Sequence, residues 1–212
     1  MLFRSLADLE VAQALACEKL PPPNHYNHVE YRRNLPHFQP DGAALFITFR
    51  LHGTLPLRSG RDGRAFVEAD RELEHATLGP AWLKQSQIAG CVAETILDGD
   101  RVRALYSLIA FVVMPNHVHL LIEPKAPAPK ITQYVKGVSA RRANELLQRT
   151  GQPFWQDESF DRWVRSQRER EKIIRYIEMN PVSANLASEP ELFRFSSAFA
   201  HRLKPVPPHT TG

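Results

Sequence analysis

The chain has 212 residues, of which 43% are hydrophobic and 24% are charged, and its formal net charge at pH 7 is +4. This balance is typical of a globular protein and excludes a collagen-like chain, a coiled coil and a disordered acidic tail. A charge of +4 is compatible with a polyanionic partner but is too small to indicate one by itself. Only two cysteines are present and no apolar run is long enough to span a membrane, so we expect a cytoplasmic protein.

Residues 1–42 are predicted to form a short N-terminal helix followed by an extended arm. The helix ends at Pro21–Pro23, because proline lacks an amide hydrogen and fixes φ. One domain is predicted over residues 43–200, since no long linker interrupts it. A flexible, proline-rich tail is expected at residues 201–212.

Within this domain, the first strand is predicted at Ala43–His52, where alternate apolar residues would share one face. A helix is predicted at Arg64–Ala76. Another is predicted from Pro80 to about Leu97, because proline suits the first turn of a helix. The Asp-Gly-Asp sequence at 98–100 then predicts a tight turn.

The second half of the domain begins with two strand-like runs, Val102–Met114 and His117–Glu123, and the Pro-Asn dipeptide between them predicts a hairpin. Helices are predicted at Ile131–Arg149 and Ser166–Asn180, the latter stopped by Pro181. The order strand, helices, hairpin, helices predicts an α+β protein with a ferredoxin-like antiparallel sheet and packed helices.

The most informative pair of residues is His117 and His119, in the sequence M-P-N-H-V-H-L-L. Side chains alternate along a strand, so both imidazoles would lie on one face, where they could bind one divalent ion. A pair of histidines on the solvent face of the sheet is the alternative. The apolar neighbours favour a buried strand, and buried histidines need partners.

A second pair, Tyr176 and Asn180, lies four residues apart in a predicted helix and would therefore project from one face. The alternative is an aromatic residue at the edge of the core and a C-terminal helix cap. Of the five tyrosines, Tyr134 and Tyr176 are the two that a helix could bring to the histidines.

Four segments together resemble the REP-associated tyrosine transposases, a branch of the single-tyrosine HUH transposases related to small insertion-sequence transposases. They are Y-R-R-N-L-P-H-F-Q-P-D-G-A-A-L-F-I-T-F-R-L, M-P-N-H-V-H-L-L, F-W-Q-D-E-S-F-D-R-W-V-R and R-Y-I-E-M-N-P-V-S-A-N-L, and they span roughly Tyr31 to Leu186. The resemblance implies an HUH transposase core of ferredoxin-like fold. It also implies that His117 and His119 bind a divalent metal, that Tyr176 is the nucleophile and that Asn180 completes the metal site.

We therefore expect a metal-dependent single-stranded DNA endonuclease and strand transferase, a transposase that acts on hairpin or palindromic repeat DNA through a covalent 5′-phosphotyrosine. Mg²⁺ or Mn²⁺ is the expected cofactor. Tyrosine, with an ordinary pKa of about 10, needs such help to act as a nucleophile. No glycine-rich phosphate loop is present, which argues against a nucleotide cofactor. A monomer or homodimer associated with the nucleoid, without a membrane partner, is expected.

The second half of the domain also carries the charge excess. From Ile131 to Asn180, ten Lys and Arg stand against seven Asp and Glu, which gives +3 of the chain's +4. Cations can contact phosphates and aromatic rings can stack on unpaired bases. The alternative is a solvated helix face and a small aromatic core. The candidate DNA-binding residues are Lys136, Arg141, Arg142, Arg165, Arg168, Trp155, Arg32 and Arg33.

Two other functions are compatible with these patterns. One is a non-cleaving hairpin DNA-binding protein derived from a transposase, and the other is a metal hydrolase without a covalent step. The presence of His117, His119 and Tyr176 together favours the cleaving enzyme, because an idle site has no chemical reason to retain the set.

Overall fold

The structure is a computed structural model, and all of the residues that it describes belong to one of the two compact units of the chain, Gln39–Gly212. It describes residues 43–54, 79–164 and 166–202. The segments predicted at residues 1–42 and 64–76, and nearly all of the predicted tail, lie outside the described residues. No helix within the described part is long and apolar enough to cross a membrane.

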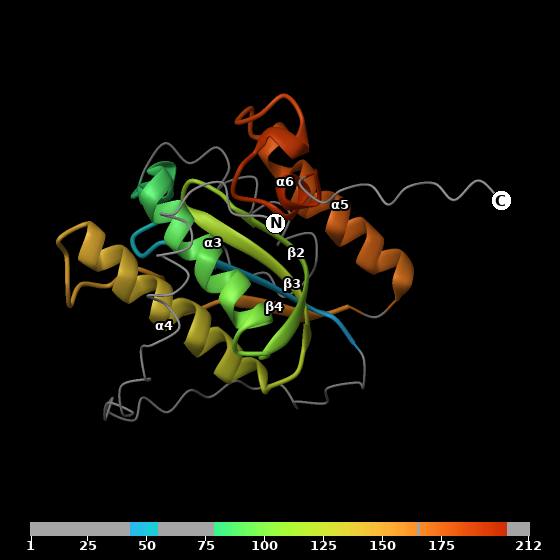
Figure 1. The fold of residues 1–212 in the computed structure, drawn as a ribbon, viewed down its shortest axis with the longest axis horizontal. Coiled ribbons are helices and arrows are strands. Elements are labelled where there is room, and N and C mark those ends of the chain that lie inside the picture. The colour runs from blue at the N-terminus through green and yellow to red at the C-terminus, as the bar shows by residue number, and fades with distance from the viewer. Residues whose placement is uncertain (1–42, 55–78, 165, 203–212) are drawn as a thin grey trace, which may run out of the picture. The chain divides into compact units, whose positions relative to one another are not determined.

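The described elements alternate between strands and helices in a β-α-β-β-α-β order (Figure 1). They are β1 (Leu45–Arg50), η1 (Trp82–Lys84), α3 (Ser86–Arg101), β2 (Tyr106–Val113), β3 (His117–Pro124), α4 (Ala128–Leu146), β4 (Phe160–Trp163), α5 (Gln167–Ser183), η2 (Pro190–Leu192) and α6 (Ser197–Arg202). The strands pair in the order β2-β3-β1-β4, and every pairing is antiparallel. This topology confirms the predicted ferredoxin-like α+β fold.

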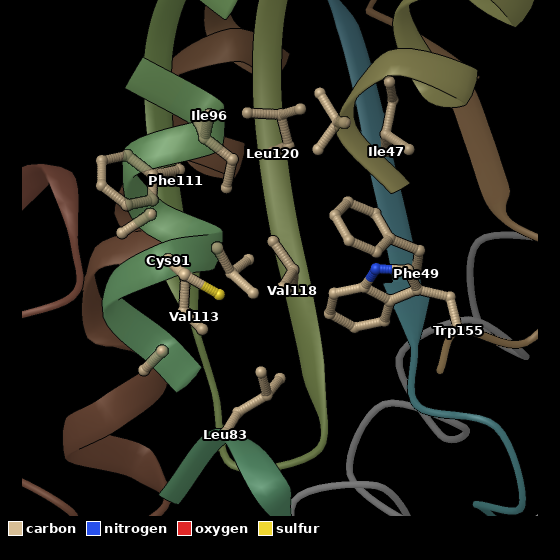
Figure 2. Close-up of a cluster of buried hydrophobic side chains, with 14 of the residues drawn as sticks. Ile47, Phe49, Leu83, Cys91, Ile96, Phe111, Val113, Val118, Leu120 and Trp155 are labelled. Atoms are coloured by element: carbon tan, nitrogen blue, oxygen red, sulfur yellow. The ribbon is translucent and has the colours of Figure 1, made fainter. Parts of the chain in front are cut away.

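One face of the sheet is covered by α3 and α4. On β3, Val118, Leu120 and Ile122 belong to this apolar cluster, as Leu45, Ile47 and Phe49 do on β1. Figure 2 shows several of these strand side chains beside Cys91 and Ile96 of α3, with Trp155 next to Phe49. This cluster is the larger of the two hydrophobic cores of the described part.

The other face carries a smaller apolar cluster that includes Ile177 of α5. Leu121 of β3 and Phe46 of β1 lie opposite each other on this face and belong to the same cluster. Because side chains alternate along β3, His117 and His119 share the face of Leu121. The two histidines therefore lie on the α5 side of the sheet.

The predicted turn at Asp98–Asp100 is wrong, because α3 continues to Arg101. Gly99 is buried inside this helix, where a Cβ atom would clash with the ring and hydroxyl of Tyr106. The glycine at this position therefore reflects close packing and is not a turn signal. Glycine costs a helix interior about 1 kcal/mol relative to alanine, and the close approach of the tyrosine requires it here. The same helix also begins later than predicted, at Ser86, after η1.

The prediction that Pro181 ends the last long helix is also wrong, since α5 runs to Ser183. A proline this close to the C-terminal end removes one backbone hydrogen bond and leaves the turns before it intact. The residues beyond it still bond back into the helix, with the Ala184 amide donating to the Asn180 carbonyl at 3.0 Å.

The fourth strand, β4, was not predicted. It has four residues and pairs with β1 at the edge of the sheet, with Thr48 opposite Phe160 and Leu45 opposite Trp163. Its sequence, F-D-R-W, does not alternate between apolar and polar residues, because the two central residues, Asp161 and Arg162, are both charged. Both are exposed in the structure. Only pairing with β1 makes this segment a strand.

Candidate active site

The two histidines of β3 form a closely packed pair. His117 and His119 are both fully buried, and their Nε2 atoms lie 3.1 Å apart. Burial excludes the alternative of two histidines on the solvent face of the sheet. Because side chains alternate along a β-strand, both rings lie on the same face of the sheet. The edge of each ring that carries Nε2 points toward the other ring.

The Nδ1 atom, on the opposite edge of each ring, lies within hydrogen-bond distance of a polar side chain. The Nδ1 atom of His117 lies 2.6 Å from Oδ1 of Asn116, and Nδ1 of His119 lies 2.8 Å from the hydroxyl oxygen of Thr48. Asn116 comes from the hairpin turn and Thr48 from β1, so two neighbouring segments orient the pair. The sequence interpretation used the Pro-Asn dipeptide only as a turn signal and missed Thr48 altogether.

This arrangement fits a divalent metal. Two imidazole nitrogens that each bind one ion at about 2.1 Å in perpendicular directions stand about 3.0 Å apart, which is close to the observed separation of 3.1 Å. In the part of the chain that the structure describes, no cluster of three or more His, Cys, Asp or Glu side chains could hold a metal. Amide, hydroxyl, water or substrate oxygens could complete the coordination.

Tyr176 lies directly beside this pair. Its ring centroid is 5.4 Å from that of His119, and it also meets Phe46 edge-on at 6.5 Å. Helix α5, which carries it, is capped by the Ser166 hydroxyl, which accepts a hydrogen bond from the Glu169 amide at 3.2 Å. Ile177 is buried against the sheet and leaves Tyr176, the preceding residue, half-buried beside the histidines.

The other tyrosine considered for this role, Tyr134, is on the opposite face of the sheet. Its side chain packs against the α3–α4 core, and its hydroxyl donates a hydrogen bond to Asp98. Burial, together with this bond, raises the pKa of Tyr134 to about 12, which disfavours the phenolate form that a nucleophile needs. Of the two candidates, the structure brings only Tyr176 to the histidines.

Asn180 lies one turn beyond Tyr176 on α5 and is 2% exposed. Its spacing of four residues places it on the same side of the helix as Tyr176. The cap residue of α5 is Ala184, so the alternative that Asn180 is the helix cap does not hold. A buried amide on this side of α5 is suited to supply an oxygen ligand.

Arg50 is a cation that the sequence interpretation did not select. It pairs with His117 across β1 and β3, which puts the two side chains on one face. Its guanidinium is half-buried and donates to the Thr54 carbonyl at 2.9 Å. Burial lowers the pKa of Arg50, and the charge of Glu158 opposes this effect; arginine nevertheless stays protonated.

The candidate DNA-binding residues are spread over the molecule. Arg141 on α4 and Arg168 on α5 are exposed, and Arg142 is half-buried. Lys136 of α4 donates to the carbonyls of Gln156 and Asp157 at 2.7 and 2.9 Å, so it anchors the segment before β4. Because α4 covers the face opposite the histidines, its cations are not part of the histidine–tyrosine site. The predicted Arg32, Arg33 and Arg165 lie outside the described residues.

The structure contradicts the prediction that Trp155 stacks on DNA bases. The indole is 5% exposed, lies edge-on to Phe49 at 4.8 Å and donates from Nε1 to the Ser139 hydroxyl at 2.9 Å. It belongs to the α3–α4 core, where no base can reach its faces. This position agrees with the alternative of a small aromatic core that the sequence analysis left open.

Residues 94–180 match the family model described as "Transposase IS200 like". The matched segment includes all four residues discussed above, namely His117, His119, Tyr176 and Asn180. This match covers less than half of the chain and agrees with the resemblance to small insertion-sequence transposases that the sequence motifs indicated.

Two solved structures are similar to the chain. One is described as a REP-associated tyrosine transposase bound to a REP hairpin, with 19% identity, a TM-score of 0.49, and coverage of 77% of this chain and 83% of that one. The other is described as a putative transposase from Deinococcus radiodurans R1, with 21% identity, a TM-score of 0.38, and coverage of 65% and 89%. No curated protein matches the chain.

Proposed function

We propose that this protein is a metal-dependent endonuclease and strand transferase for single-stranded DNA, which cleaves hairpin or palindromic repeat DNA through a covalent 5′-phosphotyrosine. One observation carries the proposal. The ring of Tyr176 lies 5.4 Å from that of His119, whose Nε2 atom converges with that of His117. These contacts support the proposal, because they bring the candidate nucleophile next to the two candidate metal-binding nitrogens.

His117 and His119 would hold a divalent ion, Mg²⁺ or Mn²⁺, with Asn180 as the candidate oxygen ligand. When bound, such an ion neutralises charge on a phosphate and orients it for attack. Arg50, in register with His117 on the same face, is placed to add a second positive charge. A guanidinium suits this task because it binds phosphate oxygens through two N–H groups at once.

In the proposed reaction, the phenolic oxygen of Tyr176 attacks the phosphorus of the scissile phosphodiester. The bond from phosphorus to the 3′ oxygen breaks, the phenolic proton passes to solvent and the leaving 3′ oxygen takes up a proton. The product is a 5′-phosphotyrosine and a free 3′-hydroxyl. Because the new phosphodiester keeps the phosphate activated, a 3′-hydroxyl can attack it and rejoin a strand without ATP.

The direct test is the formation of a protein–DNA adduct that resists denaturation by SDS. A hairpin substrate labelled on the 3′ side of the cleavage point, incubated with Mg²⁺ or Mn²⁺, should become attached to the wild-type protein. Tyr176→Phe should form no adduct, whereas Tyr134→Phe, the matched control on the opposite face, should form it normally. Cleavage at the wild-type rate by Tyr176→Phe would disprove the covalent mechanism.

The non-cleaving alternative predicts a different result. A binding module would retain hairpins at equal affinity with and without the metal and would yield no adduct on any hairpin substrate. Buried imidazoles and a buried amide are costly to fold unless they are satisfied, and a site used only for DNA binding does not need them. The observed pair therefore favours cleavage.

A further inference from the structure

We propose that Phe160 forms a stacking site for one unpaired base of single-stranded DNA, beside the histidine pair on the α5 face of the sheet. The placement of this base next to the scissile phosphate rests on the proposed function. The stacking site itself stands on the register of three strands, on the packing of Phe160 and on two arginines that share its face.

The register of β3, β1 and β4 places Phe160 in one row with the site. His119 lies opposite Thr48, and Thr48 lies opposite Phe160. Residues directly opposite each other in neighbouring strands share a face of the sheet, so Phe160 is on the face of the histidines. Neighbouring strands are about 4.8 Å apart, which puts the backbone of Phe160 about 10 Å from that of His119. A single nucleotide can span this distance.

The packing of Phe160 suits a surface that receives a base. The residue is half-buried, meets the ring of Phe46 edge-on at 6.5 Å and packs against the smaller apolar cluster. Phe46 in turn stacks on His119 at 5.8 Å. A partly exposed ring that other rings hold in place is a suitable platform, because every base has an apolar face that can stack on it.

The position of β4 in the sheet makes this platform reachable. In the order β2-β3-β1-β4, β4 is at the edge, and α5 packs mainly against β2 and β3. Phe160 therefore lies toward the side of this face that α5 covers less. A four-stranded sheet of this topology can bind single strands through aromatic residues on one face, as RNA-recognition modules do.

Two arginines lie on the same face, on either side of the row. Arg162 comes two residues after Phe160 on β4, and Arg50 comes two residues after Thr48 on β1, in the opposite direction because the strands are antiparallel. The side chain of Arg162 is 46% exposed and pairs with Glu169 in the first turn of α5. Cations for phosphates on both sides of a ring for a base are the combination that binds single strands.

The first experiment separates stacking on a base from contacts with the DNA backbone. One hairpin probe has single-stranded oligothymidine flanks, and the other has flanks of the same length without bases. Fluorescence anisotropy measures their affinity for the full-length protein carrying Tyr176→Phe, which we expect not to cleave them. In this parent protein, Phe160→Leu keeps an apolar side chain but removes the ring, and should weaken binding of the thymidine probe about tenfold, in the range for the loss of one stacked base.

The probe without bases gives the decisive comparison. Phe160→Leu should leave its affinity unchanged, whereas Arg162→Gln should weaken both probes alike, since a phosphate contact does not depend on the base. Phe160→Tyr, which keeps the ring, should bind the thymidine probe within about threefold of the parent protein. Equal losses on both probes for Phe160→Leu, or no loss on the thymidine probe, would overturn the stacking site.

A matched control on the same strand separates this effect from loss of stability. Trp163 lies opposite Leu45 and packs against the α3–α4 core, on the face away from the histidines. Trp163→Leu should lower the melting temperature and leave the affinity for both probes unchanged. Weaker binding of the thymidine probe alone by this variant would contradict the assignment of the stacking surface to the face of Phe160.

A last measurement tests the position of the base relative to the reaction. A single abasic nucleotide moved along the flank identifies the stacked base, as the position where its effect disappears in Phe160→Leu. This base should adjoin the nucleotide that the wild type joins to Tyr176, and a distant position would contradict the proposed placement. If the wild type forms no adduct, the proposed function fails, whereas the comparison of the two probes still decides whether Phe160 stacks on a base.

Discussion

The two faces of the sheet are built from the same strands, but the α3–α4 face carries the larger apolar core, whereas the α5 face combines a smaller apolar cluster with the buried histidine pair. Along β3, Val118, Leu120 and Ile122 join the apolar α3–α4 core, while His117 and His119 face α5 among polar partners. Since consecutive side chains of a strand point to opposite faces of the sheet, substitutions at two neighbouring positions affect different faces. Stability and the proposed chemistry are thus separable at neighbouring positions.

The buried side chains on the two faces also contribute differently to the free energy of unfolding. Each buried Leu or Ile side chain on the α3–α4 face contributes about 1.5–3 kcal/mol. On the α5 face, buried imidazole, hydroxyl and amide groups contribute little net stability and become costly when a partner is removed. The larger apolar core on the α3–α4 face therefore helps to stabilise a fold that holds these buried polar groups on the α5 face.

The largest expected effect is on the α5 face. Tyr176→Phe removes only the phenolic oxygen, so we expect the melting temperature to stay nearly constant and adduct formation to fall by about 10³-fold or more, as when a nucleophile is deleted. Gel analysis of the labelled hairpin measures the adduct. A loss of the same size in Tyr134→Phe would break the distinction between the two faces.

Removal of a histidine should give the next largest effect. His119→Ala takes away one nitrogen of the converging pair, and we expect cleavage to fall about 10²-fold, with a similar loss when the wild type is treated with EDTA. His52, which is exposed, provides the control. His52→Ala should cleave normally, and full activity of the wild type in EDTA would refute the metal requirement.

On the apolar face, Leu120→Ala should act on stability instead. Leu120 is 1% exposed and is next to His119 in sequence, and deletion of a buried leucine side chain costs about 2–5 kcal/mol. Urea denaturation should show this loss, while adduct formation well below the melting temperature should change by less than about threefold. A large loss of activity in a fully folded variant would show that the faces are coupled.

Trp155→Phe tests the corrected position of the indole. The substitution removes the hydrogen bond to Ser139 and leaves a small cavity beside Phe49, so we expect a destabilisation of about 1–3 kcal/mol. Hairpin affinity in a filter-binding assay should be unchanged. Weaker binding by the folded variant would restore the role in base stacking.

The smallest expected effect appears at alkaline pH. The fold raises the pKa of Tyr134 from 10 to about 12, which means that the folded protein favours the neutral phenol. Its contribution to stability is complete below pH 10 and is lost as the pH rises from 10 to 12. Stability measured against pH should therefore fall less steeply in this window for Tyr134→Phe, and an identical slope would show that Tyr134 is not the group responsible.

The elements that were predicted correctly have strong local signals. The hairpin of β2 and β3 follows from two apolar runs around a Pro-Asn turn, and the helices that match α4 and α5 follow from their composition. The elements that were missed or misplaced depend on distant contacts. The strand β4 is defined by its pairing with β1, and the glycine that predicted a turn lies inside α3, where Tyr106 packs against it.

Some residues of the proposed site could be selected from the sequence, and others could not. His117, His119, Tyr176 and Asn180 could be selected because their spacing and their motifs are local. Thr48 and Arg50 could not, since the register of β1 against β3 brings them to the histidines, with Thr48 opposite His119 and Arg50 opposite His117. Trp155 was misassigned because its sequence does not reveal its packing against Phe49.

By itself, the sequence determined a mildly basic α+β composition and pattern, a histidine pair on one strand face and, through its motifs, a resemblance to a family. The first two depend on composition and period, and the resemblance depends on the motifs themselves; all are local properties of the chain. Only the tertiary structure decided which tyrosine meets the histidines, which cations share their face and which groups hold the rings. Such choices depend on strand order and on which helix covers which face, and these arise from contacts between segments far apart in the sequence.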